Sequence, residues 1–332
     1  KQLARLEEIK IKAEEEKLLE EKEKLEGLLN SPSKLKTYIK KEIREDAKLY
    51  GDDRRCKLCE HEAAQEIKED ELLPVTPVTV VLSRMGWVRS ASGSDIDATS
   101  LAYRSGDEFL SKASGKSNDS AVFISNKGRI YNVEIRDLPS ARSQGEPLSS
   151  KVKLSDGEQA IHVIIPRAGK EYLLTSDKAY GFICKAEDLL TRNRAGKALL
   201  NVDEGCNILP PLEIYDPKSD LVAVASEQGR LLIYSIEELP HISSGRGNKL
   251  ISINSSKLAV GADGVAAVAV LPRGSALTVH CGKRYINITS AELEARISSR
   301  TRSGDMMPRG FQKIDSLEVI LSGEVSDDFS LA

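Results

Sequence analysis

The sequence predicts a mainly β fold in which five propeller-like blades form a disc, preceded by an α-helical coiled-coil arm. Two glycine-centred markers recur in phase, about every 50 residues from Pro74 onward, as in repeat architectures. The first 50 residues instead combine near-heptad leucine spacing with dense Glu and Lys, a pattern typical of charged helices. We therefore divide the chain into an arm (1–50), a linker (51–73), a five-bladed domain (74–320) and an acidic tail (321–332).

The arm is predicted to be two helices separated by a break. Residues 1–29 contain no proline, and their apolar side chains follow helical spacings at Leu3, Leu6, Ile11, Leu18, Leu25 and Leu28. Asn30-Ser31-Pro32 ends this helix because proline cannot continue it, and serine offers an N-cap for the next helix. The second helix is expected over 33–50, followed by Gly51. The pattern leaves open whether the arm packs on a helix of this chain or of a second chain.

The linker holds the one metal-like cluster of the sequence, Cys56-Lys57-Leu58-Cys59 followed by His61. A structural zinc site needs four ligands, usually as two pairs, and no second CxxC exists. Two thiols in a tether is therefore the favoured interpretation, and zinc is the alternative. Residues 315–332 contain five acids and no base, whereas residues 74–314 carry 31 Lys and Arg against 26 Asp and Glu. A mildly basic body of this kind can bind a polyanion if its cations cluster on one surface.

Five β-hairpins are predicted from apolar strands that end in a turn residue followed by a basic or aromatic side chain. The turn positions are Gly86, Gly128, Ala179, Gly229 and Gly282. The preceding strands are Val78–Leu82, Ala121–Ile124, Tyr172–Thr175, Leu221–Ala225 and Leu277–Val279.

The second half of each repeat carries a short helical or turn segment and then a glycine loop. The segments hold one apolar residue that we expect to be buried, at Ile96, Leu138, Leu189, Leu239 and Leu293. The loop glycines, each followed three residues later by an apolar residue, are Gly106, Gly145, Gly196, Gly247 and Gly304. Because two independent markers keep phase over five units, the sequence predicts five blades, whose radial repetition leaves few exposed strand edges.

The composition excludes several classes of function. The chain is 40% hydrophobic and 30% charged, which suits a globular fold, and it has no apolar run long enough to span a membrane. Five cysteines in 332 residues do not make a disulfide framework and fit a reducing cytoplasm. Phosphate-binding and nucleophile-elbow motifs are absent. We interpret His162 and Tyr285 as strand residues, and we predict no catalytic residue and no metal site.

The glycine loops are the candidate functional site, because each places an arginine shortly before its glycine. Glycine lets the backbone approach a surface closely, and the guanidinium fork suits phosphate. Loops at equivalent places on successive blades would form an arc that holds duplex DNA without reading its sequence. The alternative is that these arginines cap strand ends or pair with acids of a neighbouring blade. The predicted DNA-binding residues are Arg104, Arg142, Arg192, Arg194, Lys197, Arg246, Lys249, Lys283, Arg284, Arg300, Arg302 and Arg309.

Several segments resemble the A subunits of bacterial type IIA topoisomerases, and those of topoisomerase IV (ParC) more closely than those of gyrase. They run in order over roughly residues 1–320: Arg5–Lys10, Tyr50–Arg55, Ser83–Ser90, Gly115–Asn118, Arg192–Lys197, Gly245–Lys249 and Met307–Gln312. The resemblance implies that residues 1–50 are the coiled-coil arm of the breakage–reunion core, returning from the C-gate contact. It also implies that residues 74–320 are a β-pinwheel, a propeller relative whose blades exchange strands.

The same resemblance places the DNA-cleaving tyrosine upstream of Lys1, so no residue of this chain inherits that role. Mg²⁺ and ATP would bind on the upstream core and on the partner protein ParE, which leaves no cofactor for this chain. The implied partners are double-stranded DNA, ParE and a second copy of the ParC chain, on the nucleoid in the cytoplasm.

Gyrase A subunits carry a glycine box, Gln-Arg-Arg-Gly-Gly-Lys-Gly, that lets the pinwheel wrap DNA. The nearest segment here is Arg192–Lys197, which is one glycine short. The resemblance therefore favours ATP-dependent decatenation and relaxation in chromosome segregation over negative supercoiling. Two alternatives stay open: a gyrase A domain that wraps DNA, and a propeller scaffold that binds an acidic protein.

Overall fold

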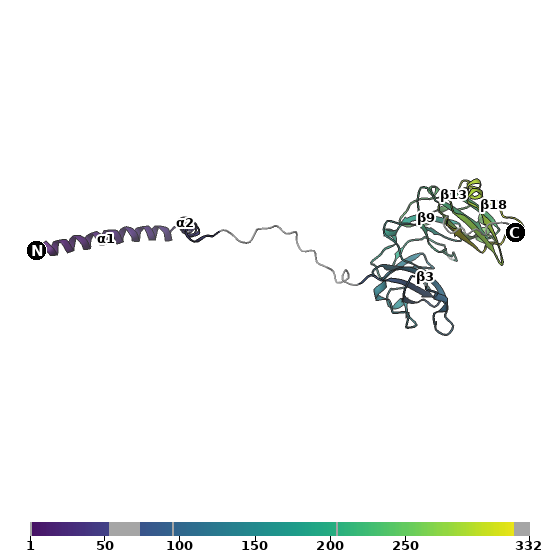
Figure 1. Cartoon of the computed structure of the whole chain (residues 1–332), viewed down its shortest axis with the longest axis horizontal. Helices are drawn as coiled ribbons and strands as arrows, with labels where there is room; N and C mark the ends of the chain where they lie inside the picture. The colour runs from purple at the N-terminus through teal and green to yellow at the C-terminus, as the bar shows by residue number, and fades with distance from the viewer. Residues whose placement is uncertain (1, 53–73, 95, 204, 322–332) are drawn as a thin grey trace. The chain divides into compact units, whose positions relative to one another are not determined.

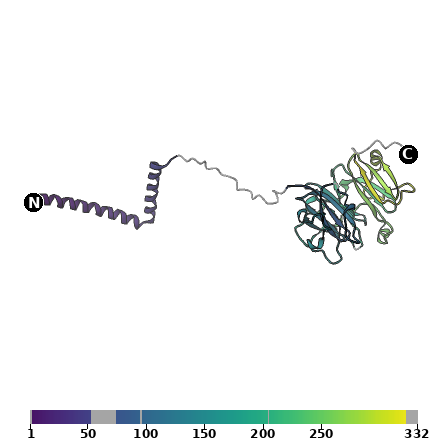
Figure 2. The ribbon, with the colours of Figure 1, turned by 60° about the horizontal axis from the view of Figure 1, so that its bottom comes forward.

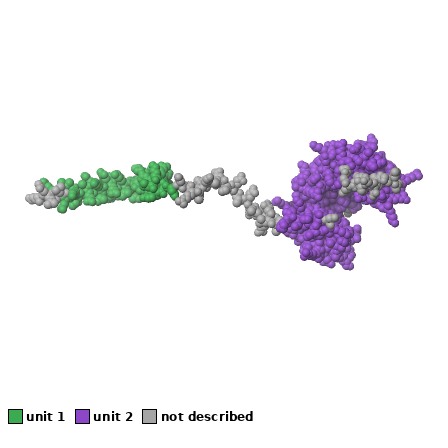
Figure 3. Space-filling view, viewed as in Figure 1, with its two compact units in different colours: residues 1–67 green, residues 68–332 purple. Residues whose placement is uncertain are grey.

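The computed structural model describes residues 2–52, 74–94, 96–203 and 205–321. It divides into two compact units, residues 1–67 and 68–332, shown in Figure 3, and each is described by itself. The expected linker beyond Asp52, with its Cys56–Cys59 cluster, and the tail beyond Leu321 lie outside the described residues.

The first unit contains two helices, α1 (Gln2–Leu29) and α2 (Pro32–Tyr50), and Figure 2 shows the sharp change of direction between them. The expected break is confirmed, and α2 begins one residue earlier than expected because the fixed φ of its proline suits a first helical turn. Gly51 follows in an extended conformation, with φ −72°. Ile11 and Leu18 of α1 are 64% and 61% exposed, so the apolar stripe of α1 is not covered within this unit.

The second unit contains five antiparallel sheets that follow one another along the chain (Figure 1), each built on a hairpin as expected. The hairpins are β1 (Pro77–Ser83) with β2 (Trp87–Ser92), β4 (Ser120–Ser125) with β5 (Arg129–Glu134), β8 (Glu171–Thr175) with β9 (Tyr180–Lys185), β12 (Leu221–Ser226) with β13 (Arg230–Ser235), and β16 (Ala276–Cys281) with β17 (Arg284–Ile288). A later strand then pairs with the first strand of each hairpin: β3 (Phe109–Lys116), β7 (Ala160–Ile164), β11 (Leu212–Ile214), β15 (Val265–Leu271) and β19 (Ser316–Ile320).

Four sheets receive a further strand from the following repeat, which is the strand exchange expected of a β-pinwheel. The strand β6 lies beyond the second hairpin but pairs with β2 of the first sheet, with Pro147 opposite Trp87 and Glu146 opposite Val88. The exchanged strands are β6 (Glu146–Pro147), β10 (Lys197–Ala198), β14 (Asn248–Lys249) and β18 (Asp305–Met306). Within the described residues the fifth sheet, β17-β16-β19, has three strands.

Each repeat also contains one or two short helical turns, and most of these turns bury an apolar side chain in or directly after the turn. They are η1 (Ala98–Ser100), η2 (Ile135–Asp137), η3 (Leu148–Ser150), η4 (Ala186–Leu189), η5 (Ile236–Glu238), α4 (Ser255–Ala259) and α5 (Ser290–Ala295). Leu138, Leu189, Leu239 and Leu293 are buried as expected. The expectation for Ile96 was wrong: it is only half-buried, and Ala98 of η1 is buried instead.

The backbone at the turns explains the first glycine marker. The turn residue has a positive φ in every hairpin: 77° at Gly86, 73° at Gly128, 64° at Ala179, 78° at Gly229 and 63° at Gly282. Among the described residues Ala179 is the only non-glycine with a positive φ, so placing it in the glycine series is confirmed. The fifth turn is shorter than the others, since Cys281 pairs directly with Arg284.

The apolar core lies between successive sheets. Four clusters of buried side chains each join two neighbouring sheets, from the first pair to the last. Their largest fully buried members are Tyr131, Tyr234, Phe123 and Phe182. Each sheet therefore depends on its neighbour for burial, as expected for stacked repeats.

Candidate nucleic-acid interface

The glycine loops of the second to fifth repeats lie at the outer edge of the preceding sheet. The later strands, such as β3 and β7 or β15 and β19, contact one another at one side of the sheets. In the sheet order β3-β1-β2-β6 the exchanged strand occupies the opposite edge, and the next three sheets are arranged in the same way. Each exchanged strand begins directly after a loop glycine, so these four loops occupy equivalent places at the outer edge.

Close packing against the neighbouring sheet requires glycine in these loops. Gly145 and Gly304 have φ of 91° and 73°. A Cβ atom would lie 2.7 Å from the carbonyl oxygen of Val88 in the first case and of Leu231 in the second, closer than real Cβ atoms approach. The glycine therefore fixes how tightly each loop lies against the preceding sheet.

Backbone hydrogen bonds link each loop to the segment that follows the previous loop. Three such bonds connect successive sheets: Lys153 N–H to Arg194 O (2.8 Å), Asn201 N–H to Gly245 O (2.9 Å) and Ser252 N–H to Arg302 O (3.0 Å). The four loops are thus neighbours along one edge.

The first loop differs from the other four. Its glycine, Gly106, precedes no exchanged strand, and the segment folds back on its own hairpin. The Arg104 guanidinium lies 3.5 Å from the centre of the Trp87 ring, and Arg84 pairs with Glu108 at 2.9 Å. The five loops are therefore not equivalent: the first pairs with its own hairpin, and the described residues contain no sheet before β1 that could accept a strand from it.

Most of the twelve predicted DNA-binding side chains are exposed. Eight of the twelve have no interaction partner among the described residues. Within the described residues, no hydrogen bond, ion pair or ring contact engages the side chains of Arg142, Arg192, Arg194, Lys249, Lys283, Arg284, Arg302 and Arg309. Lys283 and Arg284 lie at the turn of the fifth hairpin, and Arg309 lies between β18 and β19, so these three are outside the exchanged loops.

The other four predicted residues are engaged within the fold. Lys197 donates to Asp188 O at 2.9 Å. Arg300 is half-buried and donates to Glu238 O (3.1 Å) and Lys249 O (2.5 Å). Arg246 pairs with Asp203 at 2.7 Å, and Arg104 stacks on Trp87. The hydrogen bonds of Lys197 and Arg300 and the ion pair of Arg246 are of the structural kind that competes with phosphate binding, whereas the ring contact of Arg104 leaves its charge uncancelled.

Three further arginines support the loops, and sequence reasoning assigned them no role. Arg89 is 3% exposed and donates to Ala102 O (2.9 Å) and Ser143 O (3.1 Å), which joins the first and second loops. Arg129 donates to Ala195 O and Gly196 O, and Arg230 donates to Gly304 O. The basic residue after the hairpin turn is the sequence signal that could have identified Arg129 and Arg230. Their hydrogen-bond partners could not be predicted, because these lie more than 60 residues away in the sequence.

Serine hydroxyls at the turns were also missed. The side chains of Ser83, Ser125 and Ser226 accept the backbone N–H of the residue four positions later, at 3.0, 3.1 and 3.3 Å. Their shared place, directly before the turn, is the signal that could have identified them. Tyr285, interpreted as a strand residue, lies in β17 and is 62% exposed on the face of its sheet.

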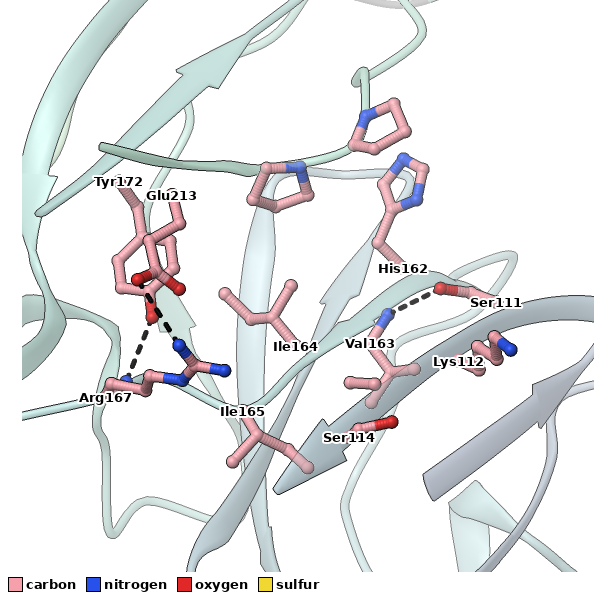
Figure 4. A pocket seen from close by; sticks show the side chains of 13 residues that line it. Ser111, Lys112, Ser114, His162, Val163, Ile164, Ile165, Arg167, Tyr172 and Glu213 are labelled. Atoms are coloured by element: carbon pink, nitrogen blue, oxygen red, sulfur yellow. Dashed lines mark hydrogen bonds and ion pairs between the residues drawn. The ribbon is translucent and has the colours of Figure 1, made fainter. Parts of the chain in front are cut away.

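A pocket lined by residues of β3, β7 and β11 is shown in Figure 4. His162 lies in its wall, and the lining residues form no catalytic arrangement. His162 Nε2 lies 2.8 Å from Ile208 O, which confirms its interpretation as a hydrogen-bonded strand residue. Burial lowers the pKa of this imidazole. Across the pocket from His162, Arg167 pairs with Glu213 at 3.6 Å, and its backbone N–H donates to the Tyr172 hydroxyl (Figure 4).

The described residues contain no group of three or more His, Cys, Asp or Glu that could hold a metal ion. Burial raises the pKa of the Cys184 thiol to about 12, so this cysteine is a protonated core residue at neutral pH. Of the helices that the structure describes, none has the length and apolarity to cross a membrane.

Comparison with known sequences places this arrangement in a family. The model of the "DNA gyrase C-terminal domain, beta-propeller" matches residues 119–167, 170–205 and 220–272. The A subunit of DNA topoisomerase 4 from Salmonella typhimurium is 46% identical over 317 residues, which are 96% of this chain and 42% of that protein. The chain thus spans less than half the length of this relative.

Solved structures agree with the sequence comparison. The E. coli ParC C-terminal domain is 45% identical and superposes with a TM-score of 0.66, over 74% of this chain and 98% of that one. A DNA gyrase A C-terminal domain, 14% identical with a TM-score of 0.54 over 74% of this chain and 83% of that one, shares the fold. The chain therefore belongs to the ParC family, the A subunits of topoisomerase IV, and its second unit is the C-terminal β-pinwheel of that family.

Proposed function

We propose that the chain is the C-terminal part of a topoisomerase IV ParC protein, whose pinwheel holds duplex DNA along its outer edge. The DNA would be selected there and presented to the cleavage core for decatenation and relaxation. The observation that carries the proposal is the row of four linked loops, three of which hold exposed arginines without a protein partner.

The chemistry of this edge suits phosphate rather than bases. Arginine donates in a fork that matches phosphate oxygens, and a row of such forks neutralises a backbone without reading sequence. The loops pack on the neighbouring sheet through glycine. Their arginine and lysine residues are therefore attached to an ordered backbone and not to a flexible segment. A protein that neutralises several phosphates in this way loses affinity steeply as salt rises.

The rest of the reaction is proposed to lie outside this chain. The chain spans 42% of the length of its Salmonella relative, and we assign the DNA-cleaving tyrosine, Mg²⁺ and ATP to the remaining parts of the enzyme. The chain alone would then be inactive as a topoisomerase. The uncovered apolar stripe of α1 suits a role as the arm of the cleavage core, where ParE and a second ParC chain assemble.

Salt-dependent DNA binding by the 332-residue chain tests the proposal. A random-sequence duplex of about 40 base pairs would be titrated at 50 and 200 mM salt and followed by fluorescence anisotropy. With about four phosphate contacts, affinity should fall roughly 100-fold between these salt concentrations. No binding at 50 mM, or binding that is indifferent to salt, would contradict the proposal.

The related gyrase domain gives a second candidate, a pinwheel that wraps DNA tightly. The two functions differ in the topology that they impose on DNA. The chain would be bound to relaxed closed-circular DNA, which is then treated with a nicking–closing enzyme. We expect little change in linking number, whereas a large shift would favour the wrapping function.

A further inference from the structure

The third sheet holds its loop arginine differently from its neighbours. In the second and fourth sheets the residue after the hairpin turn is Arg129 or Arg230, which binds the backbone of the incoming loop. In the third sheet this residue is Tyr180, and its ring lies 4.2 Å from the Arg246 guanidinium. Here the ring holds the side chain of the loop arginine rather than the loop backbone.

A carboxylate also engages Arg246. Asp203 Oδ2 accepts from Arg246 Nη2 at 2.7 Å, and the two side chains are 64% and 45% exposed. Asp203 is brought there because Asn201 donates its backbone N–H to Gly245 O, which fixes the two segments side by side. Arg246 therefore has one face on an aromatic ring and one edge on an acid.

These two contacts have opposite consequences for phosphate binding. The ring restricts the guanidinium without cancelling its charge, which lowers the ordering cost of a later contact. The carboxylate occupies an N–H edge that a phosphate would need. Exposed ion pairs of this kind are weak, so a polyanion that offers several phosphates can displace Asp203. Arg142, Arg194 and Arg302 in the neighbouring loops have no carboxylate partner among the described residues.

We propose that Tyr180 and Asp203 set the contribution of the third sheet to DNA binding. Tyr180 is a positioning residue that keeps Arg246 at the outer edge, and Asp203 is a built-in competitor that masks it until a duplex displaces the carboxylate. This inference rests on the proposed function, since the ligand that it names is the same DNA backbone. It adds that an acid placed beside the arginine of this edge lowers the affinity of the edge for DNA.

Removing the acid should strengthen binding. Asp203→Asn in the full chain is expected to tighten duplex binding about three- to tenfold at 100 mM salt. It should also steepen the plot of log K against log salt by up to about 0.9, the value of one phosphate contact. The matched control is Glu294→Gln, which removes one exposed carboxylate that has no side-chain partner among the described residues. This control should change affinity less than twofold.

Changing the ring should act in the other direction. Tyr180→Leu is expected to weaken binding about threefold, while Tyr180→Phe, which keeps the ring, should bind as the parent chain does. In an Arg246→Ala background both Asp203→Asn and Tyr180→Leu should lose their effect on affinity. Thermal unfolding of each variant separates loss of contact from loss of fold, and Tyr180→Phe keeps the test valid if Tyr180→Leu is poorly folded.

The outcomes separate the two proposals. If the parent chain binds DNA with the expected salt dependence but Asp203→Asn binds no tighter, the masking role is overturned and the DNA-binding function stands. The masking role is equally overturned if Asp203→Asn tightens binding as much without Arg246 as with it, because the effect is then general charge. If the parent chain does not bind DNA, both proposals fail together.

Discussion

The arginines of the hairpins and the arginines of the loops have opposite environments. Arg89, Arg129 and Arg230 are buried or half-buried and donate to backbone carbonyls of the loops. Arg142 and Arg302, in the loops themselves, are exposed and have no side-chain partner among the described residues. Counting basic residues therefore does not locate the candidate DNA-binding surface. The place of each arginine, in a hairpin or in a loop, and its tertiary partners do.

The largest expected effect is on stability, at a hairpin arginine. Arg89→Met removes two charge-assisted hydrogen bonds and leaves Ala102 O and Ser143 O without this donor, which should cost about 2–3 kcal/mol of unfolding free energy. Arg142→Met, in the loop beside it, should stay within about 0.5 kcal/mol of the parent, as surface changes usually do. Urea denaturation of the full chain measures both. Equal losses of unfolding free energy in the two variants would contradict the difference between hairpin and loop arginines.

The next effect separates the exchanged loops from the first loop. Gly304→Ala meets both a positive φ and the nearby Leu231 carbonyl, so we expect it to cost about 2 kcal/mol or more. Gly106→Ala meets only the positive φ, because no atom lies within 4 Å of its Cβ position, and should cost about 1 kcal/mol. The difference in denaturation midpoint is the readout. A first loop as sensitive as the fourth exchanged loop would show that it is packed in the same way.

The smallest expected effect is the pH dependence of stability that His162 contributes. Arg89 stays charged when it is buried, whereas the imidazole of His162 can lose its charge. Burial lowers the pKa of His162, so the folded state favours the uncharged imidazole. As pH falls below the ordinary value of 6.5, the unfolded chain takes up a proton that the folded chain resists, and stability should decline by up to about 1 kcal/mol. Unfolding at pH 7.5 and 5.5 measures it. His162→Gln should remove that part of the pH dependence, and an unchanged dependence would assign it to other groups.

Local rules made the hairpins predictable from the sequence. A turn that needs a positive φ selects glycine, and the periodic series identified even Ala179 as a turn residue. The exchanged strands escaped individual prediction because two residues, such as Glu146–Pro147, have no periodicity, and their partner in β2 lies 58 or more residues earlier.

The candidate site was predictable only in part. The Arg–Gly loops and their common edge follow from the repeat phase. Which arginine is free depends on tertiary neighbours, such as Asp188 O for Lys197 or Asp203 for Arg246. The folding back of the first loop was likewise invisible to the repeat pattern, because it depends on contacts with its own hairpin, such as Arg104 with Trp87 and Glu108 with Arg84.

The most direct test of the central claim is the salt dependence of duplex binding by the chain with its free loop arginines replaced. The variant would carry Arg142→Ala, Arg192→Ala, Arg194→Ala and Arg302→Ala in the full chain, with thermal unfolding measured alongside. The slope of log K against log salt should shrink in magnitude by about 2–4, with affinity at 100 mM salt at least about tenfold weaker and the fold intact. A slope and affinity equal to those of the parent chain would contradict the claim that DNA lies along this edge.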